Sequence, residues 1–161
     1  MLDDTKVLQA LRLRWEYLSE DEDLAHGIYR DDAVLEFPQS GERFEGVQNF
    51  REWRRQYPAK LEFHLRRIHH RDDLVVAEYV ISHDGAPWLF TVSIMEVEDD
   101  RVSRERIYIT EGWEPAEWRA EQLAAGPTIQ SLDTVVSFNN EVYSGTTYRE
   151  DVPPLNNKRI R

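Results

Sequence analysis

The strongest constraint on the fold is a series of four strand-like segments in the middle of the chain. Apolar and β-branched residues dominate them, and only the short, turn-prone stretches RDD, HDGA and DD separate one from the next. Separators this short favour antiparallel hairpins, because a parallel connection needs a crossover of about a dozen residues or more. The predicted strands are residues 60–70, 74–82, 87–98 and 101–110.

The residues before these strands predict helices and one short hairpin. In residues 4–18, apolar side chains recur at spacings of three and four, which marks one face of an amphipathic helix. The predicted helices come first and the consecutive strands follow, which is the order of an α+β fold rather than an α/β fold. The other elements expected here are helices over residues 21–29 and 47–57 and a hairpin of residues 33–37 and 43–46.

Composition narrows the class of protein. The 161 residues suit one domain, and the formal net charge of −11 repels phosphate backbones, so we expect no nucleic-acid partner. The chain has no cysteine, which excludes a disulfide framework, a thiolate nucleophile and a cysteine zinc site. We see no signal-peptide pattern and no apolar run of membrane-spanning length. We therefore expect a cytoplasmic protein without a membrane partner.

Four stretches carry a resemblance to a known superfamily: YRDDAVLEFP, the NFREW helix after Gly46, LVVAEYVISHDG and IMEVEDDRVSRERIYI. Together they resemble the nuclear transport factor 2-like superfamily, in its SnoaL-like and ketosteroid-isomerase-like branch. The resemblance implies a curved antiparallel sheet wrapped around N-terminal helices, forming a cone-shaped α+β barrel with an internal apolar pocket. It also implies a homodimer through the outer face of the sheet.

The resemblance covers most of the chain but not its end. We assign residues 1–125 to the SnoaL-like domain and residues 126–161 to a C-terminal extension. The extension is rich in Thr, Ser and Asn, and is either a hairpin arm around Asn139 and Asn140 or a disordered tail.

The ketosteroid isomerase mechanism does not transfer to this sequence. The position of its general base, just before the proline of the first strand, is Phe37, and a phenyl ring cannot accept a proton. The position of its second carboxylic acid is Ser93 or Ile94, and its oxyanion tyrosine falls near Arg14 or Trp15. The sequence therefore has an apolar residue of the pocket wall where that mechanism needs a base. For this reason we reject steroid isomerisation by that mechanism.

Glu105 is the candidate catalytic residue. Alternation along residues 101–110 separates Ser103, Glu105, Ile107 and Ile109 from their neighbours, and the resemblance places this set toward the pocket. An apolar pocket disfavours the charged form of a carboxylate, as a general acid or base requires. The alternative is a structural Glu105 paired with Arg104, Arg106 or a helix arginine.

The same alternation, with the helix faces, predicts the pocket lining, although each residue is equally consistent with a filled core. Besides Glu105, the predicted pocket residues are Trp15, Phe37, Phe50, Trp53, Tyr79, Ile81, Leu89, Thr91, Ser93, Ile107 and Ile109.

No motif indicates a metal or a cofactor. His69 and His70 are adjacent, so on a strand they point to opposite faces and cannot easily share an ion. There is no glycine-rich phosphate loop, no G-x-S-x-G and no H-E-x-x-H. We expect neither a metal site nor a cofactor.

Two functional classes remain. The first is a protein that binds a small, mostly apolar ligand, or acts on it by cofactor-free acid/base chemistry. The second is a non-catalytic, dimeric binding or interaction module with a filled core. A cavity of about 300 Å³ or more would favour the first class. Both include a homodimer, because one sheet face carries the apolar residues Val76, Val80, Phe90, Val92 and Ile94.

Overall fold

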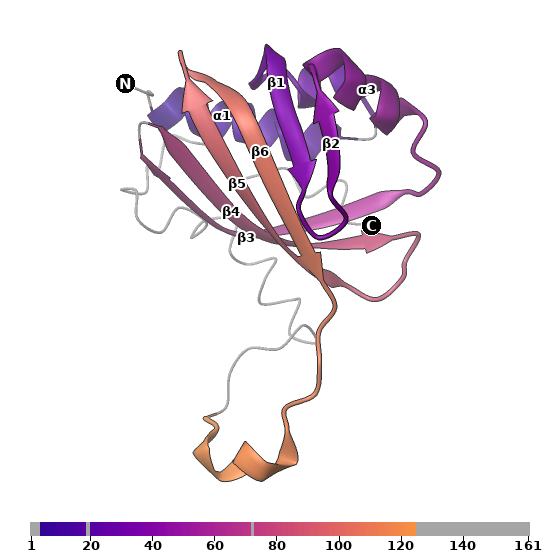
Figure 1. Ribbon diagram of the computed structural model, residues 1–161, viewed down its shortest axis with the longest axis vertical. Helices are drawn as coiled ribbons and strands as arrows, with labels where there is room; N and C mark the ends of the chain where they lie inside the picture. Colours follow the sequence, from indigo (N-terminus) through magenta and orange to yellow (C-terminus); the bar gives the residue numbers. More distant parts are fainter. Residues whose placement is uncertain (1–3, 19, 72, 125–161) are drawn as a thin grey trace.

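The computed structural model describes residues 4–18, 20–71 and 73–124. Its elements follow the predicted order, with helices first and four long strands last (Figure 1). They are α1 (Asp4–Tyr17), α2 (Glu22–Ala25), β1 (Tyr29–Phe37), β2 (Glu42–Glu45), α3 (Val47–Arg55), β3 (Leu61–Arg71), β4 (Leu74–His83), β5 (Leu89–Glu98), β6 (Arg101–Thr110) and the 3₁₀ helix η1 (Glu117–Gln122).

The strands in the described part of the chain all join one curved, unclosed sheet of six strands in the order β2-β1-β6-β5-β4-β3. Strands β3 to β6 pair as consecutive antiparallel hairpins, as predicted. The predicted α+β class and the cone-like curved sheet are confirmed. The sheet is nevertheless mixed, because β1 pairs with β6 in parallel, with Leu35 opposite Glu105.

β1 is longer than the predicted strand 33–37, because it begins at Tyr29 and includes polar residues at its start. α2 is shorter than predicted and ends at Ala25. Asp21 caps α2, since its carboxylate accepts hydrogen bonds from the backbone N–H groups of Asp23 and Leu24 at 3.1 Å each. These changes leave residues 26–28 as the connection that brings His26 close to the start of β1.

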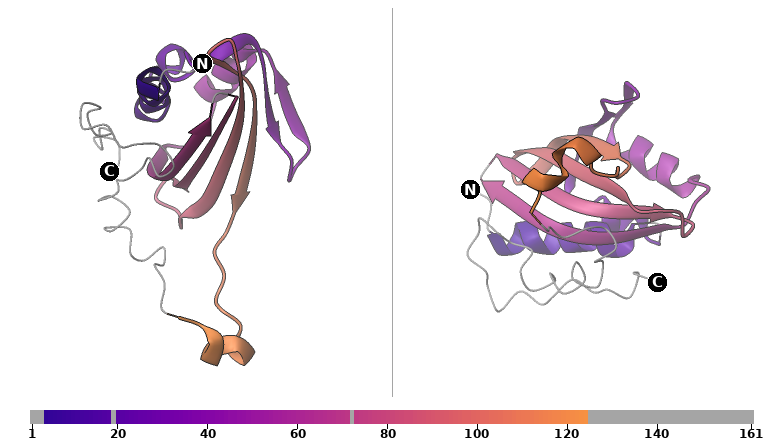
Figure 2. Two further views of the ribbon diagram at one scale, coloured as in Figure 1. Left: turned by 90° about the vertical axis from the view of Figure 1, so that its left-hand side faces the viewer. Right: turned by 90° about the horizontal axis from the view of Figure 1, so that it is seen from below.

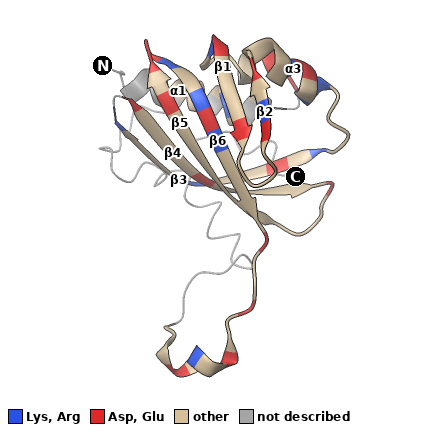
Figure 3. Cartoon of the chain, in the orientation of Figure 1, with Lys and Arg blue, Asp and Glu red and all other residues tan. Residues whose placement is uncertain are grey.

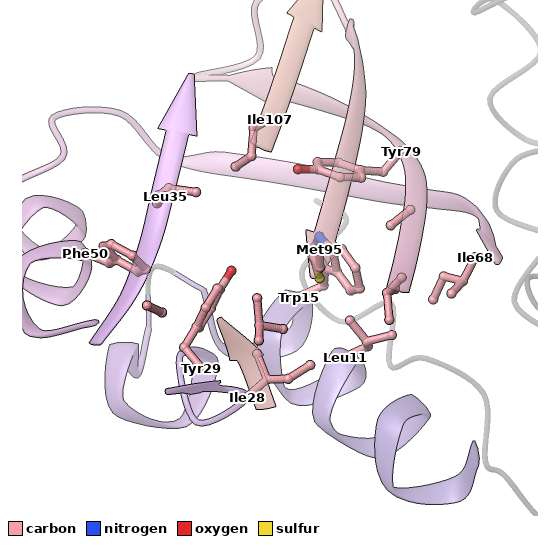
Figure 4. Close-up of a cluster of buried hydrophobic side chains, with 14 of the residues drawn as sticks. Leu11, Trp15, Ile28, Tyr29, Leu35, Phe50, Ile68, Tyr79, Met95 and Ile107 are labelled. Atoms are coloured by element: carbon pink, nitrogen blue, oxygen red, sulfur yellow. The ribbon is translucent and has the colours of Figure 1, made fainter. Parts of the chain in front are cut away.

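The helices cover one face of the sheet, and Figure 2 shows α1 on that side in both views. Alternate residues of the strands face the helices, which is why the core draws on the inner set of each strand. Leu11, Trp15 and Phe50 contribute the helical side of this core (Figure 4). The opposite, outer face of β6 carries Arg104 and Arg106, which pair with carboxylates beside them (Figure 3).

The segment after β6 differs from the body in its exposure. η1 stands apart from the sheet in Figure 1 and in the left view of Figure 2, and none of residues 111–124 is buried. Trp113 is 77% exposed and Trp118 is 83% exposed. The predicted hairpin around Asn139 and Asn140 lies outside the described residues, and so does the rest of the extension from residue 126. No helix in the described part of the chain is long and apolar enough to cross a membrane.

Candidate functional site

A cavity of about 90 Å³ lies between the helices and the inner face of the sheet. This volume is below the roughly 300 Å³ expected of a ligand pocket, yet it is larger than the space that one water molecule needs, so the core is not solid. The lining residues are Arg14, Trp15, Leu18, His26, Leu35, Phe37, Trp53, Arg54, Tyr57, Leu61, Phe63, Tyr79, Ile81, His83, Ile107 and Ile109.

Most of the predicted pocket residues lie in this lining, and four of the apolar or small ones do not. Phe50 is fully buried against Tyr29, with 5.5 Å between the ring centroids, and fills the core instead. The Ser93 hydroxyl lies 2.8 Å from the Tyr79 hydroxyl, so it is committed to a hydrogen bond behind the cavity. Thr91 and Leu89, on the same face of β5, also lie outside the lining.

One wall of the cavity is an aromatic cluster at the end of β1. The Phe37 ring lies 5.7 Å from that of Trp53, which in turn lies 4.9 Å from Phe44 and 5.7 Å from Tyr57, measured between centroids. These edge and tilted contacts join β1, β2 and α3. Phe37 therefore contributes apolar surface at the position where a steroid isomerase would have its base.

Glu105 lies on the inner face of β6, fully buried, in a polar cluster within the apolar core. The Tyr29 hydroxyl donates a hydrogen bond to Glu105 Oε2. Arg14 Nη2 lies 3.4 Å from the same oxygen and 3.5 Å from Oε1. Of the partners considered for a structural Glu105, the structure selects the helix arginine.

Glu105 is not part of the cavity lining, although Arg14 is. The carboxylate therefore sits behind the guanidinium that faces the cavity. This position suits a residue that holds Arg14 and Tyr29 in place. Its role in proton transfer stays a prediction.

Arg14 is a polar group of the lining with unmet bonding capacity. Its side chain is only 6% exposed, and no described residue accepts a hydrogen bond from Nε or Nη1. Burial lowers the pKa of Arg14, but the combined attraction of Glu105, Tyr29, Tyr79 and Glu22 outweighs it, so the pKa ends above its ordinary value and the side chain stays charged.

His26 lines the cavity as a neutral imidazole. Nδ1 lies 2.8 Å from the backbone oxygen of Glu22, and a carbonyl oxygen can only accept, so Nδ1 carries the proton. Burial first, and then the positive charge of Arg14, lower the pKa of His26 to about 3. The ring is also 3.3 Å from the Glu22 carboxylate, which does not offset these effects.

The two tyrosines of the site are hydrogen-bond donors rather than bases. Burial raises the pKa of Tyr29 well above its ordinary value, and the nearby Glu105 raises it further. Burial also raises the pKa of Tyr79, so both hydroxyls keep their protons near neutrality. Figure 4 shows both rings on the inner side of the sheet, with Leu35 and Ile107 near them.

Three polar residues of the lining on the helical side, Arg14, His26 and Arg54, were not predicted from the sequence. A signal for Arg14 was present, because it lies three residues after Leu11 and four before Leu18, on the apolar face of α1. A charge on an apolar face indicates a buried ion pair or a site. His26 and Arg54 had no comparable signal, because their burial depends on how short helices pack.

No group of three or more His, Asp or Glu side chains within the described residues is arranged to hold a metal ion. His69, on β3, is exposed and His70 is half-buried, at positions that alternate across the strand.

The chain is similar to known proteins in both sequence and structure. The model of the SnoaL-like domain family matches residues 12–105. A nuclear transport factor 2-like protein of unknown function from Burkholderia xenovorans LB400 is 36% identical, with a TM-score of 0.70, over 76% of this chain and 96% of that one. No curated protein matches the sequence.

Two more distant structures share the fold under different functional names. A putative ketosteroid isomerase from Kribbella flavida is 22% identical, with a TM-score of 0.66, over 78% of this chain and 91% of that one. An epoxide hydrolase from M. tuberculosis, described as LEH-like, is 23% identical, with a TM-score of 0.56, over 65% of this chain and 83% of that one. The fold thus accommodates more than one chemistry, so the function must be argued from the site.

Proposed function

Because the chain belongs to the SnoaL-like domain family, we propose that it binds a small, mostly apolar molecule in the cavity between its helices and its sheet. The observation that carries the proposal is the composition of the cavity wall. Aromatic and aliphatic side chains make up most of it, and a buried arginine with two unsatisfied nitrogens interrupts it. Ligand sites commonly combine an apolar wall with a few polar groups that fix orientation.

The cavity volume limits the ligand. About 90 Å³ is well below the roughly 300–1,000 Å³ of pockets for drug-sized ligands, so a steroid-sized ligand would need the cavity to expand. The ligand we propose is therefore smaller than one that would fill a cavity of about 300 Å³.

Acid/base chemistry without a cofactor is a second candidate, and the Tyr29–Glu105–Arg14 cluster is the observation that favours it. Tyr29 and Arg14 hold the Glu105 carboxylate in place, and within this cluster the carboxylate is the group that can accept a proton. Neither Glu105 nor Tyr29 belongs to the lining, so in this scheme the cavity has to open beside Arg14 before the carboxylate can reach the ligand. The alternative class, an interaction module with a filled core, needs neither the cavity nor the unsatisfied arginine.

Thermal unfolding with a panel of small apolar compounds tests the proposal. A compound at 100 times its dissociation constant should stabilise the folded state by about 2.7 kcal/mol, which raises the melting temperature by several degrees. The variant Ile109→Phe, which enlarges a half-buried lining residue, should lose this shift. Tyr108→Phe, on the outer face next to it, is the matched control and should keep it. A panel without any stabilising compound would favour the filled-core module.

A further inference from the structure

The charges that face the cavity are all positive. Arg14 and Arg54 belong to the lining, and among the described lining residues there is no Asp or Glu. This contrasts with the chain as a whole, which has a formal net charge of −11. Glu105, the carboxylate that pairs with Arg14, is buried behind the lining and is farther from a ligand than the guanidinium is. The nearest charges that a bound molecule meets are therefore two arginines.

Arg14 needs acceptors that the described protein does not provide. Nη2 is directed at Glu105, whereas Nε and Nη1 are buried without a partner among the described residues. An unsatisfied buried donor is unfavourable, so an acceptor on a ligand would gain more here than at an exposed arginine. A planar carboxylate can accept from two guanidinium nitrogens at once.

The second arginine of the lining lies on the same, helical side, whereas the polar residues Tyr79 and His83 come from β4. Arg54 is at the end of α3, 6% exposed, with its guanidinium 4.5 Å from the centroid of the Tyr57 ring. Its contact with this ring holds the positive charge in a partly apolar setting. His26 comes from the α2–β1 connection. The sheet side supplies mainly apolar surface, including Phe63, Ile81 and Ile107.

We infer that the ligand is a small monocarboxylate with a short hydrocarbon body, its head group on Arg14 and its body against the strands. This inference rests on the proposed function, since it names the ligand class of the same cavity. A neutral amide would fill the same space but would lack the attraction to the two arginines, and an amine would be repelled by them.

The test compares three probes of matched shape, 2-methylpropanoate, its primary amide and the corresponding amine, by calorimetry at one pH and ionic strength. We expect the carboxylate to bind at least about tenfold more tightly than the amide, since a hydrogen bond to a charged group contributes about that much. The amine should bind most weakly. In wild-type protein, the carboxylate should also shift the Nε–H resonance of Arg14, and the amine should not.

The variant Arg14→Gln/Glu105→Gln removes the ion pair without changing the net charge. It should reduce the preference for carboxylate over amide to about twofold or less, whereas Arg104→Gln on the outer face should keep it. The Arg14 resonance in wild-type protein decides the matter even if the double variant does not fold. Equal or tighter binding of the amide, or an unmoved Arg14 resonance, would overturn the inference while leaving a binding cavity. If none of the probes binds and no compound of the thermal panel stabilises the protein, the proposed function fails as well.

Discussion

Glu105 and Arg14 form a buried ion pair with hardly any contact with solvent. The side chain of Glu105 is 0% exposed and that of Arg14 is 6% exposed. Glu105→Gln would leave the Arg14 charge without its counter-charge. Breaking a buried pair typically costs about 3–5 kcal/mol, so we predict a loss of that order in the free energy of unfolding, measured by urea denaturation.

Two further variants separate this prediction from a general effect of mutation. Arg14→Gln/Glu105→Gln should regain much of the loss, because no unpaired charge remains. Arg104→Gln breaks only partly exposed pairs, with Glu36 and Glu96, and should cost about 1 kcal/mol or less. A fully stable Glu105→Gln protein would contradict the structural role and favour the catalytic one, in which turnover falls by roughly a hundredfold or more.

His26 predicts a pH dependence of stability. Its pKa is about 3 in the folded protein and 6.5 ordinarily, so between these values the unfolded chain binds a proton that the folded chain does not. Stability is therefore lost as the pH falls through this window, by up to about 1.4 kcal/mol per pH unit. His26→Gln should be less sensitive to acid than wild type, as urea midpoints between pH 6.5 and 4 would show. The exposed His69→Gln should follow wild type, and an identical slope in His26→Gln would refute the assignment.

At the scale of elements, the features that could be predicted were those with a local cause. Alternation placed Tyr79, Ile81 and Ile107 on the inner face, because short turns between the strands leave little freedom of register. Helical spacing placed Trp15 toward the same interior. The sequence pattern was therefore sufficient to predict the part of the cavity wall that these strands and this helix form.

The parallel pairing of β1 with β6 and the cluster around Glu105 could not be predicted in this way. Tyr29 and Arg14 lie 76 and 91 residues from Glu105, and no local pattern encodes which distant strands become neighbours. The first residues of β1 were not predicted as a strand because they are polar. Arg30, for example, forms ion pairs with Asp32 and Asp99 at the surface instead of being buried. The resemblance to the superfamily predicted the overall arrangement of helices and sheet. It did not predict that Tyr29, Arg14 and Glu105 would form a buried polar cluster.

The described core ends with β6, which leads to a prediction for the C-terminal extension. None of residues 111–124 is buried, and among the described residues the core cluster includes none after Thr110. Truncation after Gly126 should therefore change the stability by about 1 kcal/mol or less and the melting temperature by a few degrees, measured by circular dichroism. Leu11→Ala, in the core, is the reference and should cost about 2–5 kcal/mol. Loss of soluble protein on truncation would show that the extension completes the fold or an interface.

At the scale of the whole molecule, charge and apolar surface are arranged differently on the two faces of the sheet. The inner face meets the helices and the cavity. The outer face is bordered along β6 by the ion pairs of Arg104 and Arg106 with Glu36 and Glu96 (Figure 3). Beside this border, β4 and β5 present Val76, Phe90, Val92 and Ile94, which are only half-buried in the described protein. Val80, which was predicted to belong to this patch, is instead 1% exposed and does not contribute to it. A charged rim around an apolar centre is the usual anatomy of a protein interface.

We therefore predict a homodimer through this outer face. Light scattering at micromolar concentration should give about twice the chain mass of 19.1 kDa, because a broad apolar patch is uncommon on a monomer. Ile94→Glu introduces a charge at the centre of the patch and should shift the protein to the single-chain mass while its circular dichroism spectrum is unchanged. Glu78→Gln, on the same face of β4, is the control and should stay dimeric. A wild-type mass of one chain, both in the full chain and after truncation at Gly126, would rule out the dimer. A single-chain mass only in the full chain would show instead that the extension covers this face.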